Sequence, residues 1–319
     1  MASVPPAPPP IWELKPWRAT LTLATLIVVA LSTLTWLSSP SRSASHAALE
    51  EARWAPLCSG RAAALPPAAP PGPPRTGAIA TGFTRIYQQG AWGADGEGSG
   101  WGSTLRATRT TRLIMELLIH RHGVTRLLDA PCGSSHWWPP LLSRIRRFAP
   151  CFTYHGVDVV PSVIAASAAE FAGDPHTTFA VADLAGEPLP SGGVTAPWDL
   201  VLCRDALQHL PLLSVVAVLE NIARARPRFL AVGSYLEGPG VNRDVRVGDY
   251  FLINLRNAPF NLSGTEDVFD EQTVGATAAD RSENKFILLF SGAYLETVDF
   301  AAMRARAAPL LRPGASLPH

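Results

Sequence analysis

The segment from Arg126 to Trp138, RLLDAPCGSSHWW, constrains the fold more than any other part of this sequence. A short apolar run leads directly into an acidic turn that contains Gly133. Glycine lets the backbone come close to a ligand, and open α/β sheets bind ligands at the carboxyl ends of their strands. The turn therefore predicts a nucleotide-cofactor site. It lacks the G-x-G-x-x-G pattern of dinucleotide-binding folds, which disfavours a nicotinamide or flavin cofactor.

Further apolar runs follow at the spacing of a β-α alternation, and three of them end in an aspartate. They are residues 152–158 (FTYHGVD), 178–183 (TFAVAD) and 198–205 (WDLVLCRD), and residues 228–234 (RFLAVGS) supply a fifth strand. Helical segments are predicted between them over residues 161–172 and 206–225, and this alternation is typical of a parallel sheet. Residues 286–290 and 294–298 are expected to close the sheet as a late hairpin.

The segments LLDAPCG, YHGVD, FAVAD and WDLVLCRDALQHL, in this order and spacing, resemble motifs of the class I S-adenosylmethionine-dependent methyltransferases. The resemblance covers roughly residues 79–300. It extends to a group with an upstream S-G-x-G-S, present here as residues 99–103. It implies an α/β, Rossmann-like, doubly wound fold, with a mostly parallel seven-stranded sheet whose last strand is antiparallel. It also implies S-adenosylmethionine as the cofactor.

The resemblance assigns cofactor contacts position by position. Asp158 would accept hydrogen bonds from both ribose hydroxyls, a bidentate contact that suits a carboxylate. Asp183 and Leu184 would border the adenine. The other expected cofactor contacts are Asp129, Ala130, Cys132 and Gly133, which would border the methionine half, together with Cys203, Ser99 and Ser103. An aspartate at a strand-to-helix turn can instead cap free backbone amides, which is the structural alternative for these acids.

Two residues are candidates for catalysis. Asp205 and His209 lie four positions apart at the start of a predicted helix, which would put both side chains on one helix face near the binding edge. Histidine titrates near neutral pH and can accept a proton from a hydroxyl acceptor. The alternative is that Asp205 caps the helix and that His209 is a packed, hydrogen-bonded residue.

Other segments allow functional and structural interpretations. Residues 90–102 are rich in glycine and precede an amphipathic helix predicted at 105–120, so they form either a lid over the cofactor or a flexible lead-in. Trp137 and Trp138 are expected in the core rather than stacked on a substrate. Candidates for substrate contact after the fifth strand are Tyr250, Asn254 and Arg256.

Charge and cysteine content limit the partners. The formal net charge is +1 over 319 residues, so no basic surplus indicates nucleic acid. The four cysteines, Cys58, Cys132, Cys151 and Cys203, show no metal-ligand spacing. Three of them lie at or beside predicted strands, where cysteine usually behaves as a small apolar residue, so we expect neither a metal site nor a disulfide framework.

The N-terminal region has its own organisation. Residues 19–37 carry no charge and are long enough to span a bilayer as a helix. Lys15 and Arg18 precede them, so we expect a signal anchor behind a short N-terminal tail of residues 1–18. Residues 38–78 are rich in Pro and Ala and are expected to form an extended stem. The methyltransferase domain would then occupy residues 79–319.

This organisation resembles the type II single-pass plan of Golgi enzymes, which would make a glycan hydroxyl a natural methyl acceptor. The N-glycosylation triplet Asn261-Leu262-Ser263 is compatible with a lumenal domain. An organelle transit peptide is the competing interpretation of the N-terminus, although Glu13 and the long apolar run argue against it.

The sequence as a whole predicts a membrane-anchored enzyme that methylates a hydroxyl, or an amine, of a small molecule or glycan. Two alternatives stay open. A non-catalytic methyltransferase-like binding protein is one, because Ser134 follows the glycine where the resembling group favours an acid. A nicotinamide-dependent reductase is the other, but no Tyr-x-x-x-Lys pair is present, since the only lysines are Lys15 and Lys285.

Overall fold

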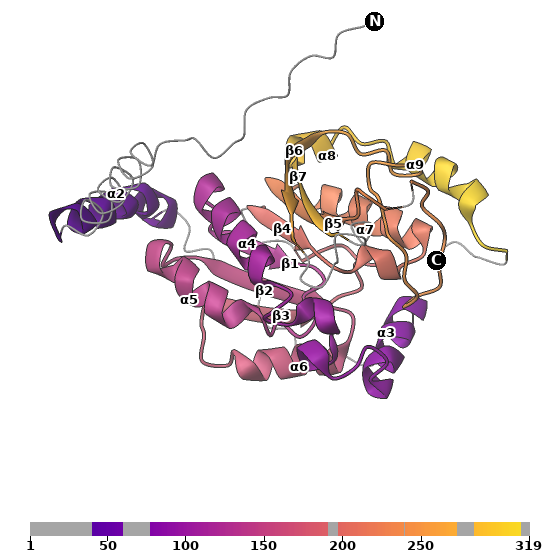
Figure 1. Ribbon diagram of the computed structural model, residues 1–319, viewed down its shortest axis with the longest axis horizontal. Coiled ribbons are helices and arrows are strands. Elements are labelled where there is room, and N and C mark those ends of the chain that lie inside the picture. Colours follow the sequence, from indigo (N-terminus) through magenta and orange to yellow (C-terminus); the bar gives the residue numbers. More distant parts are fainter. Residues whose placement is uncertain (1–39, 60–76, 191–196, 239, 273–283, 314–319) are drawn as a thin grey trace, which may run out of the picture. The chain divides into compact units, whose positions relative to one another are not determined.

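The computed structural model describes residues 40–59, 77–190, 197–238, 240–272 and 284–313. The chain divides into two compact units, Met1–Ala55 and Pro56–His319. The second unit contains a seven-stranded sheet with the strand order β3-β2-β1-β4-β5-β7-β6 (Figure 1). Its strands are β1 (Arg126–Asp129), β2 (Thr153–Asp158), β3 (Thr177–Val181), β4 (Leu200–Cys203), β5 (Phe229–Ser234), β6 (Thr265–Asp270) and β7 (Phe286–Ser291).

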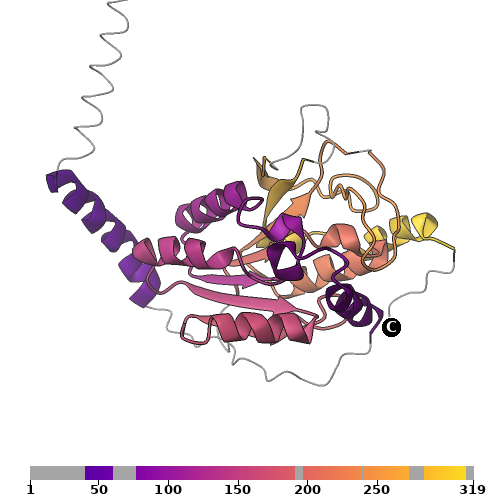
Figure 2. The ribbon, with the colours of Figure 1, turned by 60° about the horizontal axis from the view of Figure 1, so that its bottom comes forward.

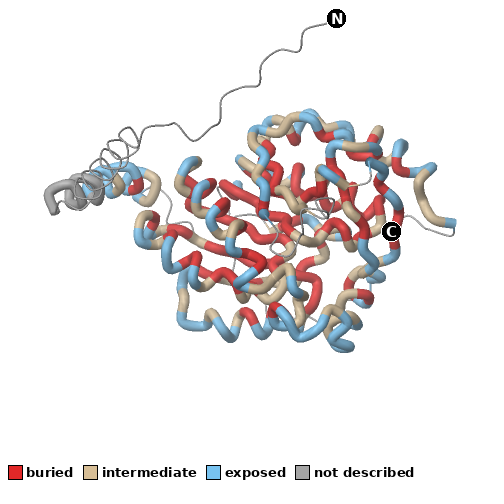
Figure 3. Tube along the Cα trace, in the orientation of Figure 1, coloured by how far each residue is buried: buried red, intermediate tan, exposed pale blue. Residues whose placement is uncertain are grey.

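The strand directions confirm the predicted sheet. Pairs β1–β2, β1–β4, β2–β3 and β4–β5 are parallel, whereas β7 runs antiparallel to both β5 and β6. Six strands therefore share one direction and the last strand in sequence opposes them. In Figure 3 the buried positions, in red, concentrate on the strands, as expected for a sheet covered on both faces.

Helices link the strands of the sheet. They are α3 (Ala78–Gln89), α4 (Arg109–His122), α5 (Trp138–Phe148), α6 (Pro161–Glu170), α7 (Leu212–Arg224), α8 (Gly292–Leu295) and α9 (Phe300–Ala307), with short 3-10 turns η1 (Asp95–Gly98), η2 (Trp101–Ser103), η3 (Leu207–His209) and η5 (Ala308–Leu310). The first helices, α4 to α6, accompany the β1–β3 half of the sheet, and α7 to α9 accompany the other half (Figure 1).

Aromatic packing covers one face of the first half of the sheet. The Trp138 ring of α5 lies 4.6 Å from Tyr154 of β2, and Tyr154 lies 5.8 Å from Phe179 of β3. Phe171, the C-cap of α6, packs 5.4 Å from Phe179. The opposite face buries Leu128 and Val157 in one cluster with residues of α7. Helices on both faces make the fold doubly wound, as predicted, and Figure 2 shows helices on either side of the sheet.

The late hairpin predicted from residues 286–290 and 294–298 is wrong in its second half. The partner of β7 is β6, and Tyr294 belongs to α8, where the Ser291 side chain caps the helix by accepting the amide of Tyr294. The Tyr294 ring stacks 5.5 Å from Phe290. Strand β6 escaped prediction because it carries acidic residues at alternating exposed positions, as edge strands often do.

The extended stem predicted for residues 38–78 is wrong over Pro40–Ser59, which forms the helix α2. This stretch contains HAALEEARW, a run of good helix formers, and the Trp54 indole donates to Glu50 one turn earlier at 3.2 Å. The proline-rich run of residues 65–74 lies outside the described residues. So does the span predicted at 19–37, and among the described helices none is long and apolar enough to cross a membrane.

A disulfide joins Cys58 to Cys151, which corrects the expectation of four unpaired cysteines. The two cysteines are 93 positions apart in sequence, so no local spacing indicates the pair. Cys151 lies just before β2, at the amino end of the strand. Cys132 and Cys203 are free and buried, as expected for small apolar residues.

Candidate functional site

A pocket opens at the carboxyl ends of β1, β2 and β4, with an empty volume of ≈ 900 Å³ that includes solvent at its mouth. Ten of the twelve predicted site residues line it: Ser99, Ser103, Asp129, Cys132, Gly133, Asp158, Asp183, Leu184, Asp205 and His209. The other two, Ala130 and Cys203, are buried and do not line the pocket. The topology therefore brings segments more than 100 positions apart to one edge, as the alternation of strands and acids predicted.

The turn after β1 forms one wall. Gly133 has a φ of +54°, a left-handed conformation that favours glycine, and a Cβ there would lie 3.0 Å from the Ser99 hydroxyl. The Cys132 amide donates to the Val157 carbonyl at 2.8 Å, and the Gly133 amide donates to Asp158 at 3.1 Å. These bonds fix the turn against the end of β2.

Asp158 is the last residue of β2 and lines the pocket from within the protein, only 7% exposed. Besides the Gly133 amide, its carboxylate accepts the Val160 amide at 3.0 Å. Burial raises the pKa of Asp158 to about 6, with the backbone hydrogen bonds opposing that rise. The carboxylate is therefore mainly ionised at pH 7, and it both caps backbone amides and faces the pocket.

Asp129 ends β1 and is held from the core side. Its Oδ2 accepts the Trp138 indole at 2.7 Å and the Tyr154 hydroxyl at 2.8 Å. Burial raises the pKa of Asp129 to about 7, although both hydrogen bonds lower it. A cation brought into the pocket beside this carboxyl group would favour the ionised form. Trp138 is in the core, as predicted, whereas its buried neighbour Trp137 also reaches the pocket lining.

The glycine-rich segment 90–103 covers one side of the pocket. The Ser99 hydroxyl accepts the Ser134 amide at 2.9 Å and shares a 2.7 Å hydrogen bond with Tyr87 of α3. The Ser134 hydroxyl in turn donates to the Gly96 carbonyl at 2.9 Å. Ser134, where an acid was expected, thus ties this segment to the turn after β1 and does not line the pocket.

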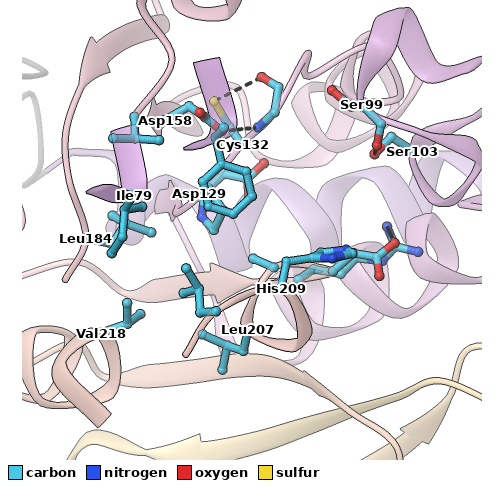
Figure 4. Close-up of a pocket in the computed structure, with 18 of the residues that line it drawn as sticks. Ile79, Ser99, Ser103, Asp129, Cys132, Asp158, Leu184, Leu207, His209 and Val218 are labelled. Carbon is cyan, nitrogen blue, oxygen red and sulfur yellow. Dashed lines mark hydrogen bonds and ion pairs between the residues drawn. The ribbon is translucent and has the colours of Figure 1, made fainter. Parts of the chain in front are cut away.

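The opposite side of the pocket is apolar. Figure 4 shows Ile79, Leu184, Leu207 and Val218 on the side away from Ser99 and Ser103. Asp183 also lines the pocket, but its Oδ1 accepts the amides of Ala185 at 3.0 Å and Gly186 at 3.3 Å. Asp183 therefore caps backbone amides in the turn after β3, which is the structural role that the sequence left open for it.

An ion-pair network holds the end of β4. Lys285 Nζ lies 2.6 Å from both carboxylate oxygens of Asp205, and Arg204 Nη1 lies 3.9 Å from that carboxylate. Arg204 also donates to Glu271 at 2.6 Å and to the Gly102 carbonyl at 3.0 Å. Burial alone would raise the pKa of Asp205, but Lys285 and Arg204 outweigh it and hold the pKa well below the ordinary carboxyl value.

The expected helical geometry of Asp205 and His209 is wrong, although both side chains line the pocket. His209 ends the 3-10 turn η3, and α7 begins only at Leu212, because Pro211 fits the N-cap of a helix and not its interior. Asp205 lies before η3 with a φ of +55°. Its short side chain points to Lys285 and Gln208, and no hydrogen bond joins it to His209 among the described contacts.

His209 is oriented by the backbone. Its Nδ1 lies 2.9 Å from the Asp249 carbonyl, which can only accept, so Nδ1 carries the hydrogen and Nε2 keeps the lone pair. The ring lies 5.0 Å from Trp92 and 5.6 Å from Tyr250. Burial lowers the pKa of His209, while the Asp205 charge and the Asp249 hydrogen bond oppose that shift. The imidazole is neutral at pH 7 and able to accept a proton.

The candidates for substrate contact at residues 250, 254 and 256 lie outside the lining of the main pocket. Asn254 is buried, where its side chain accepts the Arg256 amide at 3.0 Å, and Arg256 donates to Thr265 at 3.1 Å. Tyr250 packs beside His209 without lining the main pocket. Sequence reasoning missed Tyr87, Trp92 and Lys285, and only the rarity of lysine in the chain could have drawn attention to Lys285.

Comparison with known proteins agrees with this geometry. A family model described as a methyltransferase domain matches residues 128–226, which include the ends of β1, β2, β3 and β4. No curated protein sequence matches the chain.

Several solved structures are similar in fold. Magnesium protoporphyrin IX methyltransferase from Synechocystis PCC 6803, with bound S-adenosylhomocysteine, is 16% identical with a TM-score of 0.43, over 66% of this chain and 94% of that one. Human N-acetylserotonin methyltransferase in complex with S-adenosylmethionine is 15% identical with a TM-score of 0.41, over 66% and 58%. The N-methyltransferase NodS from Bradyrhizobium japonicum WM9 is 17% identical with a TM-score of 0.37, over 59% and 96%. The family match over residues 128–226 is to a methyltransferase domain, and it falls on the same segments whose motifs resemble the class I S-adenosylmethionine-dependent methyltransferases.

Proposed function

We propose that this protein transfers a methyl group from S-adenosylmethionine to a hydroxyl group of a small molecule or glycan. The observation that carries the proposal is Asp158, a buried carboxylate at the end of β2 that faces the pocket and is tied to the left-handed Gly133 turn. A carboxylate in this position suits a ribose diol, because its oxygens can accept both hydroxyls.

The remaining lining residues fit the other parts of that cofactor. The apolar side formed by Ile79, Leu184 and Leu207 suits a flat adenine ring. Asp129, whose buried carboxyl has a pKa of about 7, suits the positive charge of the methionine half. Gly133 lines the pocket in a left-handed conformation, and a Cβ there would crowd the Ser99 hydroxyl, so the turn beside the cofactor suits glycine.

S-adenosylmethionine, when bound, supplies a methyl group on a sulfonium that is a good leaving group. The protein then has to position an acceptor and remove one proton. His209 is the proposed proton acceptor, through Nε2, because its Nδ1 hydrogen is held by the Asp249 carbonyl. Asp205 is paired with Lys285, so its proposed role is to fix the charge and shape of the pocket floor rather than to accept the proton.

Calorimetric titration tests the cofactor assignment. The fragment should begin near residue 40, because it must retain Cys58 and its disulfide. Micromolar binding of S-adenosylmethionine and S-adenosylhomocysteine is expected, with none of NADPH. Binding of NADPH alone would revive the reductase, and binding of none of the three would favour a non-catalytic scaffold.

Replacing Asp158 with alanine is expected to weaken S-adenosylhomocysteine binding by about 10-fold to 100-fold, the loss expected for hydrogen bonds to a charged acceptor. The affinity of Asp158→Asn for S-adenosylhomocysteine should lie between those of the native protein and Asp158→Ala, since the amide keeps one acceptor oxygen. Asp267→Ala is the matched control. Asp267 lies on the edge strand β6, pairs with Arg121 of α4 and is not among the residues that line the pocket. Equal affinity in Asp158→Ala and Asp267→Ala would remove Asp158 from the cofactor site.

We also propose that the enzyme is a type II membrane protein, anchored by residues 19–37, with its domain in an oxidising compartment such as the Golgi lumen. The Cys58–Cys151 disulfide supports this location, because disulfides persist in such compartments and are rare in the cytosol. Asn261 of the glycosylation triplet is exposed on a loop before β6 and is accessible to a glycan.

Mass spectrometry of the full-length protein from secretory-competent cells, alkylated before lysis, tests the location. Cys58 and Cys151 are expected to escape alkylation until a reductant is added, whereas unfolding alone should expose Cys132 and Cys203. Glycosidase treatment should shift the Asn261 peptide, and no shift should occur in Asn261→Gln. Ready alkylation of Cys58 without reductant would place the domain in a reducing compartment.

A further inference from the structure

A second hollow lies beside the base proposed above, outside the cofactor pocket. It has an empty volume of ≈ 970 Å³ that includes open solvent, and its lining is mainly polar. Three arginines line it, Arg243 and Arg246 from the segment after β5 and Arg312 after η5. Neither the motif resemblance nor the cofactor assignment uses any of these residues.

Both carboxylates of this hollow accept hydrogen bonds from the protein, Asp244 as a buried group and Asp249 as an exposed one. The Asp244 side chain is 0% exposed, and it accepts the Leu212 amide at 2.9 Å and Arg312 Nε at 3.1 Å. Asp249 Oδ2 accepts the Arg246 backbone amide at 3.2 Å. Asp244 therefore serves as an internal brace that caps α7 and positions the guanidinium of Arg312.

The two other arginines present their charge outward. Arg243 and Arg246 are both exposed, and among the described residues neither guanidinium forms an ion pair. Arg243 Nη2 makes one hydrogen bond, to the Tyr250 carbonyl at 3.3 Å. Three guanidinium groups and two carboxylates thus line the hollow, which gives it a net charge of +1. Most N–H donors of Arg243 and Arg246 remain available to a ligand.

The hollow and His209 share one piece of backbone. The Asp249 carbonyl accepts the Nδ1 hydrogen of His209, the Gly248 amide donates to the His209 carbonyl at 2.9 Å, and Tyr250 follows directly after these two residues. The Tyr250 ring lies 5.6 Å from the His209 ring and also lines the hollow. Tyr250 is 42% exposed, and its ring adjoins both the base and the hollow.

We propose that this hollow binds an anionic substituent, a carboxylate or sulfate, on the methyl acceptor while the acceptor hydroxyl lies at His209. The proposal rests on the function proposed above and names its substrate class: an acidic sugar or hydroxy acid. Guanidinium groups donate in a fork that matches planar oxyanions, and an exposed tyrosine ring can pack against a sugar or aromatic body. Asp249 connects the anion site to the base, because its backbone carbonyl orients His209 and the residue itself lines the hollow.

Titration of the full-length protein, saturated with S-adenosylhomocysteine, with D-glucuronate, glucose 6-sulfate and glucose tests this site. Both acidic probes are expected to bind at least tenfold more tightly than glucose, and the preferred one identifies the anion. The double variant Arg243→Gln/Arg246→Gln should reduce acid binding to the level of glucose and leave S-adenosylhomocysteine binding unchanged. The matched control is Arg109→Gln/Arg147→Gln, two exposed arginines outside both linings.

The outcomes separate this proposal from the proposed function. Equal binding of acidic and neutral probes, or acid binding that survives the Arg243/Arg246 double variant, would overturn the anion site while leaving the cofactor site intact. Failure of S-adenosylhomocysteine to bind would instead overturn the proposed function, and the same titrations without it would still report on the arginines.

Discussion

Replacing Lys285 with methionine is expected to lower the free energy of unfolding by about 3 kcal/mol, because it leaves the Asp205 carboxylate largely buried without its partner. The two side chains are only 15% and 16% exposed, so solvent replaces little of the lost ion pair. The Arg204 guanidinium at 3.9 Å offsets part of the loss, which sets the estimate at the low end for a broken buried pair.

Urea unfolding of three variants checks this expectation. Lys285→Arg keeps the charge and should recover most of the stability. Lys285→Met/Asp205→Asn removes both charges and should be more stable than Lys285→Met alone, because no buried charge is left unpaired. A Lys285→Met protein as stable as the native one would show that Arg204 alone is sufficient for Asp205.

The same substitution has a pH signature with a defined sign. The pKa of Asp205 lies well below its ordinary value, so its contribution to stability is present above the ordinary carboxyl pKa and is lost as pH falls through the lowered one. Without Lys285 that pKa should rise. The difference in stability between native protein and Lys285→Met should therefore shrink as the solution is acidified.

Replacing His209 with glutamine is expected to reduce methyl-transfer turnover by about 10²-fold to 10⁴-fold, the range for loss of a positioned general base. S-adenosylhomocysteine affinity should change little, because the proposed cofactor contacts are Asp158, Asp129 and the Gly133 turn. Single-turnover kinetics with radiolabelled methyl donor measure the effect. His176→Gln is the matched control, since His176 is exposed on the loop before β3.

The pH profile distinguishes a base from a packing residue. Burial lowers the pKa of His209, so the neutral, proton-accepting form should persist below the ordinary imidazole value. With S-adenosylmethionine saturating at every pH, so that titration of Asp129 and Asp158 does not limit cofactor binding, turnover should fall on the acid side of neutral, and this acid limb should vanish in His209→Gln. An unchanged acid limb in that variant would assign His209 a purely structural role.

The sequence predicted those site residues that stand at strand ends. Asp129, Asp158 and Asp205 each follow an apolar run, and parallel strands bring their carboxyl ends to one edge whatever the rest of the chain does. The Gly133 turn was predictable for the same reason. These features depend on local patterns of a few residues, which a single sequence carries.

The contacts that depend on distant partners could not be predicted. Lys285 meets Asp205 across 80 positions, and Cys58 meets Cys151 across 93, so neither pair leaves a local pattern. The predicted placement of Asp205 and His209 on one helix face is wrong, because Pro211 delays the start of the helix to Leu212 and a 3-10 turn precedes it. The helix α2 was missed because the proline content of the whole segment obscured its helix-forming start.

The disulfide ties the end of α2 to the amino end of β2. Cys151 precedes β2 and Asp158 ends it, so the crosslink lies about 20 Å from the pocket, at the opposite edge of the sheet. Cys58 is thus fastened at the amino end of β2, whereas Ile79, 21 positions later, lines the pocket. A load applied at Cys58 would therefore be borne at the amino end of β2, away from the residues that line the pocket.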